Sequence, residues 1–131
     1  MEKMRVLLVD DETEFVTALA ERLTLRGFDA QTAFSGEEAL EKINASPPPE
    51  VVLLDMLMPG MSGMEVLKQI KQDYPQIRVI LLTGRGSWDG IQGIREGAYD
   101  CLMKPIQIEE LMHIMTSTGE GNDKAQPGKG D

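Results

Sequence analysis

The chain has 131 residues, enough for one domain with a hydrophobic core, and its one cysteine, Cys101, excludes an internal disulfide framework. A total of 22 acidic residues against 13 basic ones gives a formal net charge of −9, which argues against direct binding to a nucleic-acid backbone. The first apolar run is too short for a signal peptide, and no run approaches the roughly 18 apolar residues of a membrane helix, so we expect a cytoplasmic protein without membrane segments.

Five short segments are predicted to form strands. Most of them are apolar without alternation, which is typical of strands buried on both faces of a parallel sheet. The second is more polar and suits the edge of a sheet. In chain order the segments are 5–9, 29–33, 51–54, 79–82 and 101–103.

A segment with helical spacing follows each predicted strand. The stripe formed by Phe15, Leu19 and Leu23, with Leu25 alongside, predicts a helix from about residue 12 to residue 26, closed by Gly27. The other predicted helices are centred on residues 39–43, 64–70, 91–98 and 108–115. Three helix starts have capping-box spacing, namely Asp11 with Glu14, Ser35 with Glu38 and Ser62 with Glu65.

This alternation predicts an α/β fold, a doubly wound five-stranded parallel sheet with five helices on its two faces. We expect residues 1–118 to form the domain. Residues 119–131 contain no apolar anchor, so we expect a disordered tail or the stub of a linker.

Polar side chains follow the predicted strands where each strand ends. Asp10 and Asp11 follow the first strand, Asp55 the third, Thr83 the fourth and Lys104 the fifth. Because ligands bind at the carboxyl edge of open parallel sheets, we expect these five side chains to share one pocket. Neighbouring carboxylates repel each other by roughly 4 kcal/mol per pair at 4 Å and an effective dielectric of about 20, so positive charge must compensate. Mg²⁺ suits such a site, because it binds through few carboxylates and keeps water ligands.

This set of side chains suits phosphoryl transfer to a carboxylate. Asp55 would attack phosphorus, Asp10 and Asp11 would hold Mg²⁺, Lys104 would pair with a phosphoryl oxygen, and Thr83 would donate a hydrogen bond. Each residue also has a simpler explanation, since the acid pair can cap a helix, a threonine can end a strand and a lysine can lie on the surface. Asp55 is the exception, because an acid directly behind four apolar residues is costly without a partner.

Four motifs carry a family resemblance over roughly residues 5–118. They are LLVDDE at 7–12, LLDMLMPGMSGMEVL at 53–67, LLTGRG at 81–86 and GAYDCLMKP at 97–105. In these motifs the chain resembles the receiver domains of two-component response regulators, the CheY-like family. The resemblance implies a flavodoxin-like (βα)5 fold with strand order 2-1-3-4-5.

The resemblance also implies a phosphorylation switch. A sensor histidine kinase or a phosphotransfer protein would donate a phosphoryl group from phosphohistidine to Asp55, and Mg²⁺ would be held by Asp10, Asp11, Asp55 and the backbone carbonyl of Leu57. Thr83 and Lys104 would contact the phosphoryl group. The domain would be a signalling phosphoacceptor with self-catalysed phosphotransfer and not an ordinary enzyme.

The switch positions implied by the resemblance are Thr83, Cys101 and Pro105, and the bond before Pro105 is usually cis in the family. Cys101 stands where many members carry an aromatic ring, so burial of a ring there cannot report phosphorylation. Strand alternation would keep Tyr99 on the same face as Cys101 if the strand extends that far.

Two further positions bear on the lifetime of the phosphoryl group. Leu57 and Arg85 occupy the variable positions that tune this lifetime in the family. We predict slow autodephosphorylation, because the side chain of Leu57 cannot orient a water molecule.

The fourth predicted helix contains Gly90, Gly93 and Gly97, and each interior glycine costs about 1 kcal/mol relative to alanine. We expect this helix to move on phosphorylation and to change a surface that binds an output domain or protein. The alternative is that the glycines allow close packing. A homodimer through the fourth helix, fifth strand and fifth helix is left open.

Two other functions remain as alternatives. A phosphatase or mutase of the haloacid dehalogenase type also uses a strand-end aspartate with Mg²⁺, but it needs a second aspartate where this chain has Leu57. A flavodoxin-like module or pseudo-receiver without phosphorylation would share the fold, and failure to bind Mg²⁺ would favour it.

Overall fold

The computed structural model describes residues 3–44, 47–84 and 89–117. Within them, five strands form one parallel sheet in the order β2-β1-β3-β4-β5, which confirms the predicted fold and topology. The strands are β1 (Arg5–Val9), β2 (Asp29–Ala33), β3 (Val51–Asp55), β4 (Arg78–Thr83) and β5 (Asp100–Met103).

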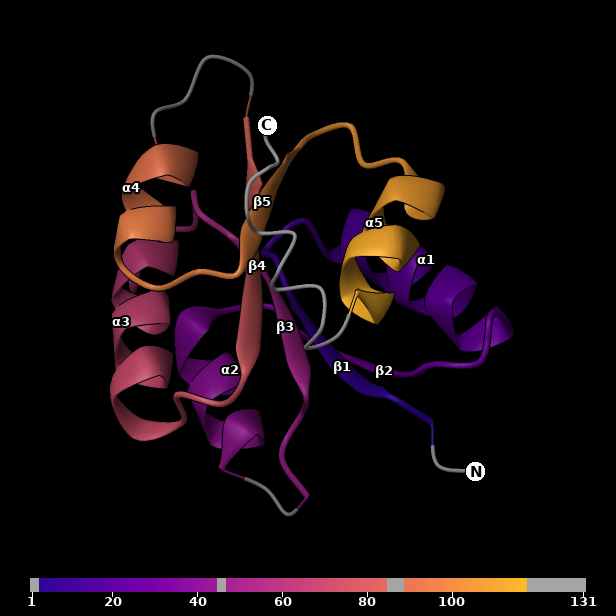
Figure 1. Ribbon diagram of the computed structural model, residues 1–131, viewed down its shortest axis with the longest axis horizontal. Coiled ribbons are helices and arrows are strands. Elements are labelled where there is room, and N and C mark those ends of the chain that lie inside the picture. The colour runs from indigo at the N-terminus through magenta and orange to yellow at the C-terminus, as the bar shows by residue number, and fades with distance from the viewer. Residues whose placement is uncertain (1–2, 45–46, 85–88, 118–131) are drawn as a thin grey trace.

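The helices cover the sheet on both faces (Figure 1). Helices α1 (Thr13–Leu25) and α5 (Ile108–Thr116) lie on one face. Helices α2 (Gly36–Ile43), α3 (Gly63–Asp73) and α4 (Asp89–Arg95) lie on the other. Among the described residues, no helix combines the length and the apolar character needed to cross a membrane.

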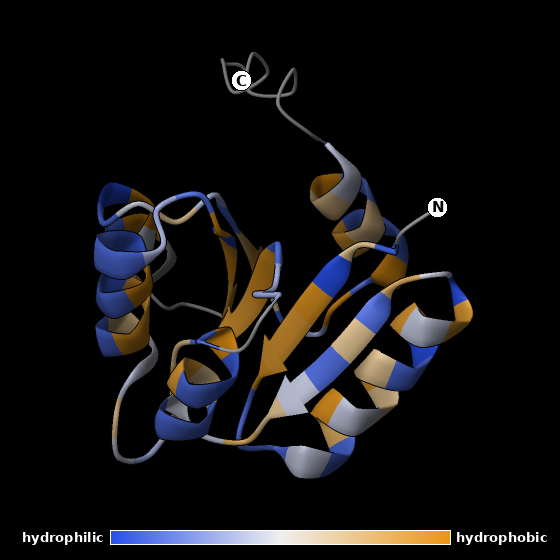
Figure 2. Cartoon of the chain, turned by 90° about the horizontal axis from the view of Figure 1, so that it is seen from below, coloured by the Kyte–Doolittle hydropathy of each residue, from blue (hydrophilic) through white to orange (hydrophobic). Residues whose placement is uncertain are grey.

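The central strand β3 explains why its sequence shows no polar alternation. Its side chains point to the two faces in turn, and each face packs into its own apolar cluster. Val52 and Leu54 join the cluster beneath α2 and α3, whereas Val51 and Leu53 join the cluster beneath α1 and α5. Figure 2 shows the hydrophobic strands in orange and amphipathic helices that carry both hydrophobic and hydrophilic residues.

Two of the three predicted helix caps are present. At α3, Ser62 Oγ accepts from the Glu65 N–H at 3.3 Å and Glu65 Oε1 accepts from the Ser62 N–H at 2.9 Å, a complete capping box. At α2, Ser35 Oγ accepts from the Glu38 N–H at 3.1 Å.

The predicted cap at Asp11 is wrong. Helix α1 begins after Glu12, and no side chain caps it. Asp11 therefore does not cap the helix, so capping does not explain its presence.

Helix α4 is shorter than the predicted segment. It ends at Arg95, and Gly97 lies beyond it with a φ of +109°, so Gly97 is not an interior glycine. A Cβ at Gly93 would collide with Cδ1 of Leu81 in β4. Gly93 thus lets α4 approach the sheet closely, which agrees with the alternative explanation for the glycines.

The end of α5 is attached to the start of β4. One terminal nitrogen of Arg78 donates to the carbonyls of Met115 and Ser117, each at 3.1 Å. The Tyr99 hydroxyl donates to the same Ser117 carbonyl at 2.7 Å, and the Arg78 guanidinium lies 5.5 Å from the Tyr99 ring centroid. Tyr99 therefore packs on the α1 and α5 face, whereas Cys101 packs on the opposite face. A shared face was expected only if the strand extended to Tyr99, and β5 begins at Asp100.

Candidate functional site

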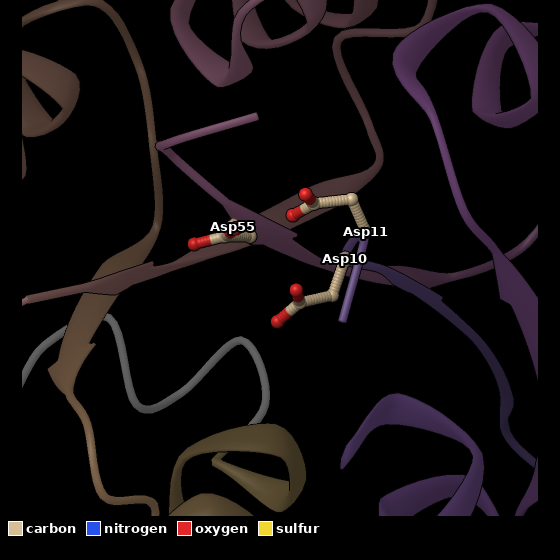
Figure 3. Close-up of side chains that lie close together, drawn as sticks. All are labelled: Asp10, Asp11 and Asp55. Carbon is tan, nitrogen blue, oxygen red and sulfur yellow. The ribbon is translucent and has the colours of Figure 1, made fainter. Parts of the chain in front are cut away.

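The site lies where β1 and β3 end side by side. Asp10 follows β1 directly and Asp55 is the last residue of β3, and the register pairs Val9 with Leu54, so the two acids are neighbours. Asp10 is fully buried and Asp55 is 6% exposed, whereas Asp11 is exposed. One carboxylate oxygen from each of the three acids lies within 4.8 Å of the others (Figure 3).

The start of α3 fixes the backbone of Asp55. A Cβ at Gly63 would lie 2.5 Å from the Asp55 carbonyl oxygen and 2.6 Å from Cα of Met56, both of them backbone atoms. A residue without a side chain is therefore required for α3 to pack against the end of β3.

Lys104 supplies the positive charge of the site. Its Nζ lies 3.0 Å from Asp10 Oδ2 and 3.5 Å from Asp55 Oδ1. Its backbone N–H donates to the Thr83 carbonyl at 2.9 Å, which joins the end of β5 to the end of β4. The lysine thus reaches across the carboxyl edge of the sheet to the two buried acids.

Lys104 has a third acidic partner, Glu12, which was not among the predicted site residues. Glu12 Oε1 lies 3.3 Å from Nζ, and the Glu12 backbone N–H donates to Asp10 Oδ1 at 2.9 Å. The sequence could have indicated this role, because Glu12 directly follows the acid pair at the same edge of the sheet.

The charges of the site shift two pKa values. Burial and the nearby Asp10 carboxylate raise the pKa of Asp55 to about 6, although Lys104 and a hydrogen bond from the Leu57 backbone oppose the rise. For Lys104, burial lowers the pKa, but the hydrogen bonds to Asp10 and Glu12 and the charges of Asp55 and Asp10 outweigh it and raise the pKa overall. The ionised form of Asp55 is thus destabilised by its surroundings, and a further positive charge nearby would stabilise it.

The three aspartates fit a magnesium ion. Their donors are hard oxygen atoms, two of the acids are buried and paired with a single ammonium, and the exposed Asp11 leaves room for water ligands. The Leu57 side chain is 65% exposed and lies two residues after Asp55. A metal contact from the Leu57 carbonyl stays a prediction.

The predicted switch residues lie in β4, in β5 and directly after Lys104. Thr83 is buried, and its hydroxyl donates to the Leu102 carbonyl at 3.4 Å. Cys101 is half-buried, and burial and the charge of Asp100 raise the pKa of its thiol. The Lys104–Pro105 bond is cis, as the family resemblance implied. Arg85 lies outside the described residues.

Known proteins match most of the chain. The family model for the response regulator receiver domain matches residues 6–116. The chain is 44% identical to a transcriptional regulatory protein, the CpxR homolog of Haemophilus influenzae, over 82% of this chain and 47% of that protein. It is 37% identical to the DNA-binding transcriptional regulator NtrC of Escherichia coli K12, over 88% of this chain and 24% of that protein. The chain therefore spans about half or a quarter of the length of these relatives.

Two solved receiver domains match this chain over nearly their whole length. A response regulator receiver domain protein from Clostridium thermocellum has a TM-score of 0.82 and 32% identity, over 92% of this chain and 98% of that one. The receiver domain of NtrX from Brucella abortus has a TM-score of 0.78 and 33% identity, over 84% and 93%.

Proposed function

This chain belongs to the response regulator receiver domain family, and from that membership we propose that Asp55 accepts a phosphoryl group from the phosphohistidine of a sensor histidine kinase or a phosphotransfer protein. One observation carries the proposal. Asp55 is a buried carboxylate with an ammonium 3.5 Å away and two more acids around a common space. The haloacid dehalogenase alternative is set aside, since the family is a different one.

The transfer is a displacement at phosphorus. An Asp55 oxygen forms a bond to phosphorus, the phosphorus–nitrogen bond of phosphohistidine breaks, and the imidazole keeps the electron pair. Lys104 pairs with a phosphoryl oxygen from its place beside Asp55. The Thr83 hydroxyl donates to another oxygen after leaving the Leu102 carbonyl.

Asp10, Asp11, Asp55 and the Leu57 carbonyl would hold Mg²⁺. When bound, the ion neutralises charge on the phosphoryl oxygens. The transfer is self-catalysed in the sense that the groups acting on phosphorus all belong to this domain. We propose no ordinary enzymatic turnover, because the product of the transfer, the phosphorylated Asp55, remains part of the chain.

The proposed output is a change of the surface around α4. The direct link from the site is Thr83, at the end of the strand against which α4 packs through Gly93. Cys101, in β5, and Pro105, which directly follows Lys104, are proposed to move with the lysine. The partner is an output domain or protein, and a homodimer through α4, β5 and α5 would use the exposed side chains of Ile94 and Met103.

The proposed organisation is a receiver unit of residues 1–118 followed by a disordered tail or linker, 119–131, which lies outside the described residues. The relatives named as DNA-binding are longer proteins, and a net charge of −9 supports a receiver unit that makes no direct contact with nucleic acid.

Phosphorylation can be tested by mass. The protein is incubated with acetyl phosphate and Mg²⁺, and intact-mass spectrometry is applied to the wild type, Asp55→Asn and the control Asp73→Asn, which changes an exposed acid in α3. We expect one added phosphoryl group on the wild type and on the control, and none on Asp55→Asn. Modification of Asp55→Asn to the wild-type extent would refute the assignment.

A further inference from the structure

The ammonium of Lys104 has three carboxylate partners, and these have different roles in the proposed reaction. Its Nζ donates hydrogen bonds to Asp10 at 3.0 Å and to Glu12 at 3.3 Å, and it forms an ion pair with Asp55 at 3.5 Å. Asp10 and Asp55 belong to the group of acids suited to a metal ion, and Asp55 is also the proposed phosphoacceptor. Glu12 belongs to neither role. It is therefore the one of these three partners that stays available to the lysine throughout the proposed reaction.

Glu12 approaches Lys104 from a fixed backbone. Its N–H donates to Asp10 Oδ1 at 2.9 Å, and its carbonyl accepts the first hydrogen bond of α1, from the Val16 N–H at 3.0 Å. The side chain then extends along the rim of the pocket, where it is 65% exposed. Because such an exposed ion pair contributes little to folding, its effect is expected on the placement of the lysine and not on stability.

An aromatic ring borders the same ammonium. The ring centroid of Phe15, in the first turn of α1, lies 5.0 Å from Lys104 Nζ. Phe15 is half-buried against the α1 and α5 cluster, so its ring is held in place. Glu12 and Phe15 thus bring the start of α1 into contact with a side chain that comes from the end of β5.

From these contacts we propose that Glu12 is a positioning residue, which keeps the Lys104 ammonium beside Asp55 when a divalent cation draws away the carboxylate of Asp10. The inference rests on the proposed function. Lysine has a long flexible stem and a strongly hydrated charge, so an ammonium that loses its nearest partner turns toward water unless another partner holds it. Glu12 provides that partner at the pocket rim.

The first test observes the lysine directly. Protein with ¹³C-labelled lysine is saturated with Mg²⁺ without a phosphodonor, and the order parameter of the Lys104 ε-methylene is measured by NMR relaxation in the wild type, Glu12→Gln and Glu14→Gln. Glu14 is exposed in the first turn of α1, so its variant removes an equal charge nearby. We expect the order to fall in Glu12→Gln and to stay unchanged in the control. Unchanged order in Glu12→Gln would overturn the proposal.

The second test follows the reaction. With saturating Mg²⁺ and acetyl phosphate, Glu12→Gln should be phosphorylated about two- to fivefold more slowly than the wild type, the range of an exposed ion pair, and Glu14→Gln should match the wild type. In a Lys104→Ala background, Glu12→Gln should cause no further slowing. Equal slowing in both backgrounds would show that Glu12 acts by its charge alone, and would overturn the proposal.

The two tests separate this inference from the proposed function. If the wild type takes up no phosphoryl group while the order of Lys104 depends on Glu12, the proposed function fails and the positioning contact stands. If phosphorylation occurs and neither the order nor the rate depends on Glu12, the positioning role fails alone.

Discussion

The buried charge of Asp55 should make the stability of the domain depend on pH in a way that one substitution removes. The substitution Asp55→Asn introduces an uncharged side chain of similar size. It is tested in a buffer with a chelator, so that no divalent cation binds. The pKa of Asp55 rises from its ordinary value of 3.8 to about 6 because the carboxylate is buried beside Asp10. At about 1.36 kcal/mol per pKa unit, this difference corresponds to about 3 kcal/mol.

The sign follows from the proton balance. Between pH 3.8 and about 6 the folded protein still holds the Asp55 proton that the unfolded chain has released, so rising pH favours unfolding through this range. Above it, the ionised carboxylate costs the folded state up to about 3 kcal/mol. The stability gain of Asp55→Asn should therefore be near zero below about pH 4 and approach that value above about pH 6.5.

The assay is urea unfolding followed by circular dichroism at a series of pH values between about 4 and 8, with the free energy of unfolding extrapolated to water. Asp73→Asn is the control, because it removes an acid that is exposed. The difference between Asp55→Asn and the wild type should grow with pH, whereas that of the control should show no such rise near pH 6. A pH-independent difference, or a mutant less stable than the wild type at pH 7.5, would refute the reasoning.

Four further outcomes follow from single residues. Leu57 offers no group to orient water, so the purified phosphoprotein should lose its phosphoryl group over many minutes, and Leu57→Asn should shorten this time in a phosphate-release assay; a half-life of seconds in the wild type would contradict it. Gly63→Ala should lower the free energy of unfolding by about 1–3 kcal/mol in urea, because the new methyl group meets backbone that cannot rotate away. Gly93→Ala should also destabilise by about 1–3 kcal/mol, despite a gain in helix propensity, and Leu81→Ala should offset part of that loss in the double variant; additive effects would disprove the contact. Tyr99→Phe removes the hydroxyl that holds the Ser117 carbonyl, so unfolding should be easier by about 1 kcal/mol and amide exchange at the end of α5 faster, which hydrogen-exchange mass spectrometry would detect.

The fold was predictable because its strands are buried on both faces. Such strands are continuous apolar runs, and the predicted segment 5–9 matched β1 to the residue. The pocket was predictable for the same reason, since parallel strands deliver Asp10, Asp55 and Lys104 to one edge. An apolar residue beside a buried helical stripe need not itself be buried. Leu25 was expected alongside the buried stripe of α1, but it is 85% exposed.

Contacts made by long or freely rotating side chains could not be predicted. The carboxylate of Glu12 meets Lys104 across 92 residues of sequence. Its place after the acid pair puts Glu12 at the right edge of the sheet, but it does not indicate which side chain the carboxylate contacts. The start of α1 was predicted one residue early because Asp11 has the spacing of a cap, but the structure gives α1 no side-chain cap. A shared face of Tyr99 and Cys101 depended on the extent of the fifth strand, and β5 begins after Tyr99, so alternation does not relate the two residues.

The attachment of α5 to Arg78 links two distant ends of the molecule through a single strand. β4 starts at the guanidinium that holds the last carbonyls of α5 and finishes at Thr83, beside the acids. A rise of about 3.3 Å per residue puts these ends about 17 Å apart. Because β4 pairs with β3 on one side and with β5 on the other, it is stiff, and it connects the anchor of α5 rigidly to the threonine at the site.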